Sequence, residues 1–430
     1  MELAALLVFF GLLRCRAFAQ SPTPNEIWQV TPAIDPADKL LAGWDEISVV
    51  KETQVYNGVQ ENRTYAHHSE LFHLNNVIYL AFSSAPVDED SMGQDARISV
   101  SHDGGLSWSH PHTVVQAAML PNQTDPHNFT YWCNLGIVQR VWQPVSFVHL
   151  VEEDALYSIV LSASVGCPGN FQSAGKVAQR INKGDGRPDG HPCWLEKNEY
   201  TEAQLYNETI FGTEYGMANC ENADSLNAIL SEPQKVPAWS SWLYNHKLYG
   251  ADNIHDLQEQ THAVWLKNEN STSGGYWQRF WRDISAKNNS LAVWVEYTHD
   301  EDGADWYPKV LNQFGNQIFE TNIPDAKTKQ HLGVLENGDR FLVSNPRYDA
   351  NLDRQPLTIA TSRGQDHSYK HIGVLRTNAS TNIAPETRDQ YKNHGFHYPS
   401  AIQIRDRLVV SYSENKENIW VSVIELGDLP

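Results

Sequence analysis

Residues 101–108 read Ser-His-Asp-Gly-Gly-Leu-Ser-Trp, and this stretch decides the fold. The Asp103 carboxylate can accept hydrogen bonds from backbone N–H groups further along the turn, while Gly104 and Gly105 tolerate the positive φ angles of a tight hairpin. Trp108 adds a large apolar side chain that can fill the space between neighbouring sheets. The stretch therefore predicts a β-hairpin whose turn seals one sheet against the next.

The spacing S-x-D-x-G-x-x-W resembles the Asp box of sialidase-like β-propellers, and a weaker copy without the Asp occupies 357–364. Two boxes imply a repeated blade. Strand-like runs separated by polar turns recur along the chain, at 71–82, 147–163, 239–248, 263–266, 291–297, 332–344 and 401–413. We expect an all-β, seven-bladed propeller at roughly 55 residues per blade, in preference to six blades or a β-sandwich. Residues 202–206 and 225–231 are expected to form short surface helices.

The chain begins with an apolar run too short to span a bilayer, followed by small residues at positions 17 and 19 that suit signal peptidase. We therefore expect a signal peptide over 1–19 and one catalytic propeller domain over 20–430. A secreted protein should be glycosylated, and the chain offers seven N-x-S/T sequons, at Asn62, Asn122, Asn128, Asn207, Asn270, Asn288 and Asn378.

Four cysteines remain once Cys15 leaves with the signal peptide, an even number that suits two disulfides in an oxidising compartment. Four cysteines allow three pairings. We expect Cys167 to pair with Cys193 and Cys133 with Cys220. No C-x-x-C pair is present, so zinc binding by these cysteines is disfavoured.

A formal net charge of −20 and a pI near 5.3 argue against nucleic acid or an anionic membrane as partner. An acidic polysaccharide remains a suitable partner if local arginines and histidines make a positive site. We expect a secreted, extracellular monomer.

Residues at the starts of the inner strands of a propeller converge around one mouth of its channel. In this chain those positions are rich in histidine and arginine; they include His67, His68, Arg140, His262, His397 and Tyr398, with Asn345, Arg347 and Arg354 close behind. Paired carboxylates suited to standard glycosidase chemistry do not stand out there, although Glu70, Glu214, Glu296 and Asp325 are candidates. A sialidase would need an arginine cluster, a Tyr/Glu nucleophile pair and an R-I-P signature, and that signature is absent.

Histidine with arginine suits β-elimination at a uronate. Arginine neutralises the carboxylate while a base removes the α-proton, and a second group protonates the leaving oxygen. No metal or other cofactor is needed if arginine neutralises the charge, although a structural cation in the channel is compatible with this scheme.

Several segments resemble the β-propellers that act on L-rhamnose-α-1,4-D-glucuronate ends of gum arabic and arabinogalactan. These are Tyr65-Ala66-His67-His68, Asp88-Glu89-Asp90, Val343–Pro346, Arg354–Leu357, His397–Ala401 and Asn415-Lys416-Glu417. The resemblance implies a fungal-type lyase that releases L-rhamnose and leaves a 4,5-unsaturated glucuronate. An α-L-rhamnosidase on the same linkage and a non-catalytic sugar-binding propeller are the alternatives.

Within this reading we assign His262 and His68 as the acid/base set, with Tyr398 and His397 in reserve. Arg347, or failing it Arg354, is expected to bind the carboxylate. Arg140, His67 and Asn345 are expected to complete the substrate-binding site.

Overall fold

The computed structural model describes residues 27–33, 43–90, 93–116, 139–165, 171–197, 217–235, 248–250, 256–267, 274–284, 291–303, 306, 310–311, 318–347, 353–364, 366, 368–381 and 392–430. The predicted signal peptide, Cys133, Cys167 and five of the seven sequons, at Asn122, Asn128, Asn207, Asn270 and Asn288, lie outside these residues. Among the described residues, no helix is long and apolar enough to cross a membrane.

The described strands form five sheets. The first two contain β2 (Tyr65–Leu74), β3 (Val77–Ala85), β4 (Asp95–Ser101) and β5 (His112–Val115), then β6 (Gln139–Leu150), β7 (Ala155–Val165), β8 (Phe171–Ile181) and β9 (Cys193–Lys197). A seven-stranded sheet contains β10 (Leu248–Gly250), β11 (Asp256–Gln258), β12 (Val264–Lys267), β13 (Gly275–Asp283), β14 (Ala292–Thr298), β15 (Val310–Leu311) and β16 (Ile318–Pro324). The last two contain β17 (His331–Val334), β18 (Arg340–Ser344), β19 (Leu357–Ser362) and β20 (His371–Arg376), then β21 (Phe396–Ile404), β22 (Arg407–Glu414), β23 (Asn418–Glu425) and the N-terminal β1 (Lys51–Asn57).

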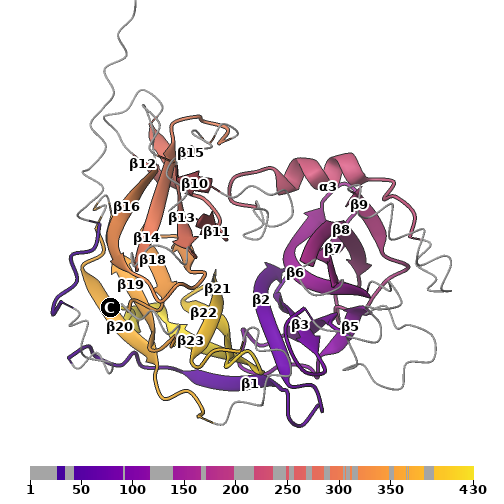
Figure 1. Cartoon of the computed structure of the whole chain (residues 1–430), viewed down its shortest axis with the longest axis horizontal. Coiled ribbons are helices and arrows are strands. Elements are labelled where there is room, and N and C mark those ends of the chain that lie inside the picture. The colour runs from indigo at the N-terminus through magenta and orange to yellow at the C-terminus, as the bar shows by residue number, and fades with distance from the viewer. Residues whose placement is uncertain are drawn as a thin grey trace, which may run out of the picture.

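The sheets surround a common centre, and the two ends of the chain join in one of them (Figure 1). β1 pairs antiparallel with β23 along its length, from Lys51 opposite Val423 to Asn57 opposite Asn418. The innermost strands β2 and β21 contact each other, so the first complete sheet also packs beside the last. This pairing attaches the N-terminal strand to the last sheet by backbone hydrogen bonds, which leaves no free edge on β23.

The Asp-box turn has the predicted structure. Asp103 accepts from the Ser107 backbone N–H at 2.9 Å and from the Ser101 hydroxyl at 2.8 Å. Trp108 packs on a core shared by the sheets of β2–β5 and β21–β23, which confirms its role between sheets. A Cβ at Gly105, where φ is +93°, would lie 3.2 Å from side-chain atoms of Val409 and Val423, so the glycine is also required by packing.

The expectation of seven blades is wrong, because the described residues form five sheets. Three of the strand runs counted as separate blades, at 239–248, 263–266 and 291–297, contribute described strands to one seven-stranded sheet: β10, β12 and β14. Polar turns between strands mark hairpins, but they do not tell whether the next hairpin continues a sheet or starts another. The expected helix at 225–231 is confirmed as α3 (Ala223–Leu230), and the one at 202–206 lies outside the described residues. A 3-10 turn, η2 (Leu426–Asp428), follows β23 near the end of the chain.

The predicted disulfide pairing is also wrong. Cys193 is bonded to Cys220, with 4.9 Å between their Cα atoms. Residues 217–220 run beside β9: the Trp194 N–H donates to the Ala218 carbonyl and the Cys220 N–H donates to the Trp194 carbonyl, at 2.8 and 2.9 Å. The backbone pairing brings the two cysteines together, which excludes both Cys167–Cys193 and Cys133–Cys220.

Replacing both Cys193 and Cys220 by alanine should lower the free energy of unfolding by about 2–5 kcal/mol, because the bond restrains the unfolded chain and ties the segment carrying α3 to β9. Denaturant titration with and without a reducing agent measures this. Reduced wild-type protein is the matched control and should approach the stability of the double variant. Equal stability of the variant and the oxidised wild type would contradict the assignment.

Candidate functional site

The same backbone irregularity occurs at the start of the innermost strand in two sheets. In β2, register passes from His67 opposite Ser83 to Glu70 opposite Ala81, and in β21 it passes from His397 opposite Ser413 to Ser400 opposite Ser411. Each strand therefore carries a bulge of two residues opposite one. The first residue of each bulge has positive φ: 58° at His68 and 50° at Tyr398. Such bulges turn a side chain out of the alternating pattern of the strand.

A third sheet has the same kind of bulge, in which the residue with positive φ is a glutamate. Gln258 pairs with Arg282, and the Thr261 N–H donates to the Phe280 carbonyl at 2.9 Å, so Glu259 and Gln260 stand opposite one residue. Glu259 again has positive φ, 57°. Non-glycine residues in this conformation are uncommon and concentrate at functional sites.

Tyr398 and Glu259 meet at the centre and share one arginine. The Tyr398 hydroxyl donates to Glu259 Oε1 at 3.2 Å. Arg282 Nη1 donates to Glu259 Oε2 at 2.5 Å and to the Tyr398 oxygen at 2.6 Å. The Arg354 guanidinium stands 5.5 Å from the centre of the Tyr398 ring. A buried tyrosine thus has a carboxylate that can take its proton and a guanidinium that can stabilise the resulting oxygen anion.

The ionisation of this pair follows from burial and charge. Burial raises the pKa of Tyr398 further than Arg282 can lower it. Burial also disfavours the ionised form of Glu259, but Arg282 and the tyrosine hydroxyl outweigh that effect and lower its pKa. Glu259 is therefore ionised and Tyr398 neutral at neutral pH, which is the arrangement of a general base beside an unreacted nucleophile.

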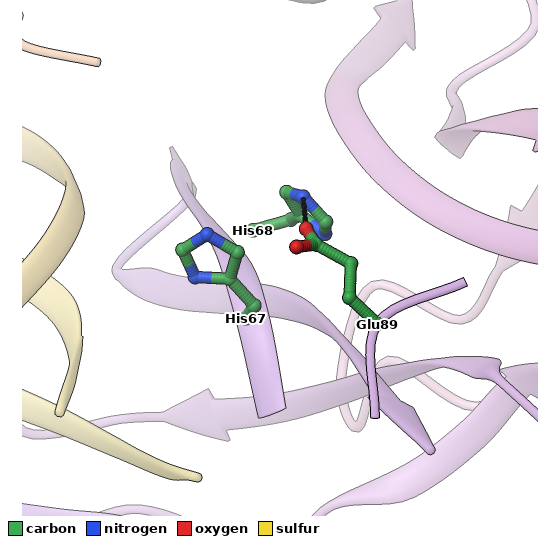
Figure 2. A group of neighbouring side chains, drawn as sticks. All are labelled: His67, His68 and Glu89. Atoms are coloured by element: carbon green, nitrogen blue, oxygen red, sulfur yellow. Dashed lines mark ion pairs between the residues drawn. The ribbon is translucent and has the colours of Figure 1, made fainter. Parts of the chain in front are cut away.

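A second carboxylate, Glu89, follows β3 and lies beside the histidines of β2. Glu89 Oε2 accepts from Lys416 Nζ at 2.6 Å, and Oε1 lies 3.2 Å from His68 Nε2 and accepts from the Tyr65 hydroxyl at 3.1 Å. Burial alone would raise the pKa of Glu89, but Lys416 and His68 hold it well below its usual range. His67, His68 and Glu89 are the group of possible metal ligands found among the described residues (Figure 2).

Two further acids at this centre hold protons more tightly than usual. Burial and the neighbouring charge of Glu89 raise the pKa of Asp90, whose Oδ1 accepts from the Gln143 amide at 2.9 Å. Burial raises the pKa of Asp325 to about 6, with Arg282 and Arg354 partly opposing the effect. A protonated carboxyl is a candidate general acid.

The structure brings together five of the residues proposed from sequence. The His67 ring centre lies 4.4 Å from that of His68, 4.2 Å from that of Tyr398 and 5.8 Å from that of His397. Arg354 Nη1 lies 2.9 Å from His397 Nδ1. All five are buried. Burial lowers the pKa of His67, His68 and His397, and the nearby cations Arg354 and Lys416 lower those of His67 and His397 further, so their imidazoles are neutral.

The other proposed residues occupy different positions. His262 Nε2 lies 3.5 Å from Glu70 Oε1, and Glu70 Oε2 lies 3.8 Å from Lys329 Nζ. Burial lowers the pKa of Lys329 overall, although the charges of Glu70 and Glu259 raise it, so this polar cluster lies near the site. Arg347 donates to Asp353 at 3.0 Å and to the Gln355 carbonyl at 3.2 Å. Asn345 donates to the carbonyls of Arg354 and Pro356 at 2.9 and 3.1 Å. Arg140 lies in β6, and its side chain is outside the described part of the chain.

Sequence reasoning missed Glu259 and Arg282. Glu259 is three residues before His262, in the polar run Gln258-Glu259-Gln260-Thr261, at the strand start that His262 was chosen from. If the hairpin had been aligned with two residues of this run opposite one residue of the partner strand, Glu259 would have been chosen as the residue facing the site. Arg282 gave no local signal, since it is at the far end of the partner strand β13.

Comparisons with known proteins agree with this fold. A model of a BNR repeat-like domain matches residues 218–410, and a model of a BT_1020-like N-terminal beta propeller matches residues 39–163. No curated protein matches the chain.

Two solved structures are similar in fold. One, described as a sialidase, aligns over 89% of this chain and 33% of its own, with a TM-score of 0.61 and 18% identity, so this chain spans about a third of its length. A protein of unknown function from Dyadobacter fermentans aligns over 88% of this chain and 99% of its own, with a TM-score of 0.50 and 14% identity. Sheet topology, Asp box and these matches define a sialidase-like β-propeller. The descriptions of these matches do not mention rhamnose or glucuronate.

The raised pKa of Asp325 predicts a specific pH dependence of stability. Because its folded-state pKa of about 6 exceeds the ordinary 3.8, the favourable contribution is complete below about pH 4 and is lost as the pH rises through 6. Asp325→Asn should therefore gain stability relative to wild type between about pH 4 and pH 7, on the order of 3 kcal/mol. Denaturant titrations across this range measure the difference. Asp302→Asn, an exposed control, should show no such trend.

Proposed function

We propose that this protein is a retaining glycoside hydrolase that removes a terminal sugar bearing a carboxylate, with Tyr398 as nucleophile. The observation that carries the proposal is the hydrogen-bonded triad of Tyr398, Glu259 and Arg282, with Arg354 beside the tyrosine. Two of the three features required of a sialidase, the Tyr/Glu pair and an arginine cluster, are thus present, and the R-I-P signature is not.

In the first step the Tyr398 oxygen attacks the anomeric carbon while its proton passes to Glu259. The bond to the leaving oxygen breaks, and Asp90 supplies the proton that this oxygen needs. A glycosyl–tyrosine intermediate results. In the second step water attacks the anomeric carbon, gives its proton to Asp90, and the tyrosine oxygen leaves and regains a proton from Glu259. A neutral nucleophile avoids the repulsion that a carboxylate would meet at a carbon next to a substrate carboxylate.

The arginines supply the charge that recognises such a sugar. Arg354 is the better candidate for the carboxylate, because Arg282 is already engaged with Glu259. A guanidinium can hold a carboxylate through two parallel hydrogen bonds, which fixes the orientation of the sugar as well as its charge. We further propose that the enzyme is secreted and monomeric and meets this sugar on an acidic polysaccharide, because its charge and sequons suit that setting.

A second candidate is the β-elimination lyase on rhamnose-glucuronate ends. The neutral imidazoles of His67, His68 and His397 beside Arg354 favour it, since they can act as bases at a uronate whose carboxylate is neutralised. In that reaction a base takes the proton at C5, the C4–O bond breaks, and the leaving rhamnose oxygen is protonated, so no water is consumed. The role of His262 as base stays a prediction within this candidate.

The experiment compares products from sialosides, glucuronides and gum arabic. The hydrolase should release a saturated sugar acid with retained anomeric configuration, detected by proton NMR during turnover. Tyr398→Phe and Glu259→Gln should each reduce the rate by about 10²–10⁴-fold or more, because each removes a group that takes part in the bond-breaking step.

Tyr369→Phe is the matched control. Tyr369 is fully buried in another cluster, its hydroxyl has no hydrogen-bond partner among the described atoms, and its loss should leave the rate unchanged. Release of free rhamnose with an ultraviolet-absorbing unsaturated uronate would favour the lyase instead. Tight binding of a sugar without turnover would indicate a lectin.

A further inference from the structure

His67, His68 and Glu89 each present one ligand atom at the centre of the propeller, and these atoms all lie within 4.8 Å of one another. All three side chains are buried. The two histidines are consecutive in β2 but face the same place because of the bulge at His68. Figure 2 shows both imidazoles and the Glu89 carboxylate turned toward one region.

Both imidazole rings are oriented through their Nδ1 atoms. His67 Nδ1 lies 2.7 Å from the Ser413 hydroxyl, and His68 Nδ1 lies 2.8 Å from the Ser83 hydroxyl. Both Nε2 atoms are thereby directed to the shared region. His67 Nε2 is buried and has no hydrogen-bond partner among the described atoms. Outer hydrogen bonds of this kind fix the tautomer and orientation of histidines that bind metals.

The unpartnered nitrogen of His67 is the gap in this network. His68 Nε2 lies 3.2 Å from Glu89 Oε1, and the Tyr65 hydroxyl donates to the same oxygen at 3.1 Å, so these atoms already have partners. A buried imidazole nitrogen without a partner among the described atoms indicates an atom that the side chains do not supply, such as an ion or a water.

The spacing is also compatible with a metal ion. Two ligand atoms about 2.0–2.2 Å from an ion at a tetrahedral angle are roughly 3.3–3.6 Å apart. The 3.2 Å between His68 Nε2 and Glu89 Oε1 is close to the lower end of that range. Lys416 engages Oε2 of Glu89, so an ion would bind at Oε1, the oxygen that also accepts from the Tyr65 hydroxyl at 3.1 Å. Two imidazole nitrogens with one carboxylate oxygen form a ligand set typical of Zn²⁺.

We propose that His67, His68 and Glu89 bind one divalent transition-metal ion of the Zn²⁺ class, with an open position for water or a ligand oxygen. The neighbouring charges of Lys416 and Arg354 oppose the ion itself, and they favour an anionic group at its open position. A carboxylate-bearing sugar would provide such a group. The proposal departs from the expectation of a metal-free site and goes beyond the proposed reaction, because the test below measures metal binding and not turnover.

The test uses the full secreted chain without a polyhistidine tag, stripped with a chelator and then titrated with Co²⁺ as a spectroscopic substitute for Zn²⁺. We expect one ion per chain by elemental analysis and visible absorption bands of tetrahedral or five-coordinate Co²⁺. His67→Ala should weaken Co²⁺ binding by more than the ~10–100-fold typical of outer partners, and Ser413→Ala by about that amount.

His331→Ala is the control, because His331 lies in β17 and stacks on Phe341. It should bind Co²⁺ as wild type does. Circular dichroism verifies that each variant is folded. If His67→Ala does not fold, Co²⁺ binding by Ser413→Ala decides the question. A wild-type chain that binds no Co²⁺ or Zn²⁺, or a folded His67→Ala that binds as tightly as wild type, would overturn the proposal. A metal-free chain that hydrolyses the sugar normally would leave the proposed function standing.

Discussion

The site depends on one backbone constraint, a two-residue bulge with positive φ at the start of an innermost strand. Without it, His68, Glu259 and Tyr398 would follow the ordinary alternation of their strands, and consecutive side chains such as His67 and His68 could not face one region. The bulge costs some backbone strain at each position. The surrounding ladder pairing of β2 with β3, and of β21 with β22, resumes on both sides of it and holds it in place. Because the bulge occurs in three sheets, side chains from all three are directed to one central site.

Because these side chains converge at the centre, several charged groups are buried together, and burial determines which of them are ionised. Carboxylates from the ends of strands in two sheets meet the cations Arg282 of β13, Arg354 before β19 and Lys416 of the turn after β22 away from solvent, where an unpaired charge would be costly. Each strong acid therefore has its own cation: Glu259 has Arg282, and Glu89 has Lys416. Asp90 and Asp325 form no ion pair with a cation among the described residues, and burial raises their pKa values. The same surroundings thus separate the acids of the site into ionised and protonated ones, as an acid/base reaction needs.

Ring closure connects stability to this arrangement. β1 completes the sheet of β21–β23, and the Asp-box turn at Trp108 packs between that sheet and the sheet of β2–β5. These two sheets carry His67, His68, His397 and Tyr398. Loosening their contact would therefore move the histidines relative to the tyrosine, even though neither β1 nor Trp108 takes part in the site. The seal between sheets is structural, but the positions of the reacting groups depend on it.

The sequence by itself determined the all-β propeller class, the Asp-box turn, the short helix and the convergence of His67, His68, His397, Tyr398 and Arg354, because these follow from local turn chemistry and from strand starts. Tertiary structure alone decided how many sheets the strands form, since a polar turn looks the same within a sheet and between sheets. It also decided the Cys193–Cys220 bond, which depends on backbone pairing across 27 residues of sequence separation. The pairing of Glu259 with Arg282 and Tyr398 was likewise hidden, because a bulge shifts the facing residue by one position and the partner charges come from strands that are distant along the chain.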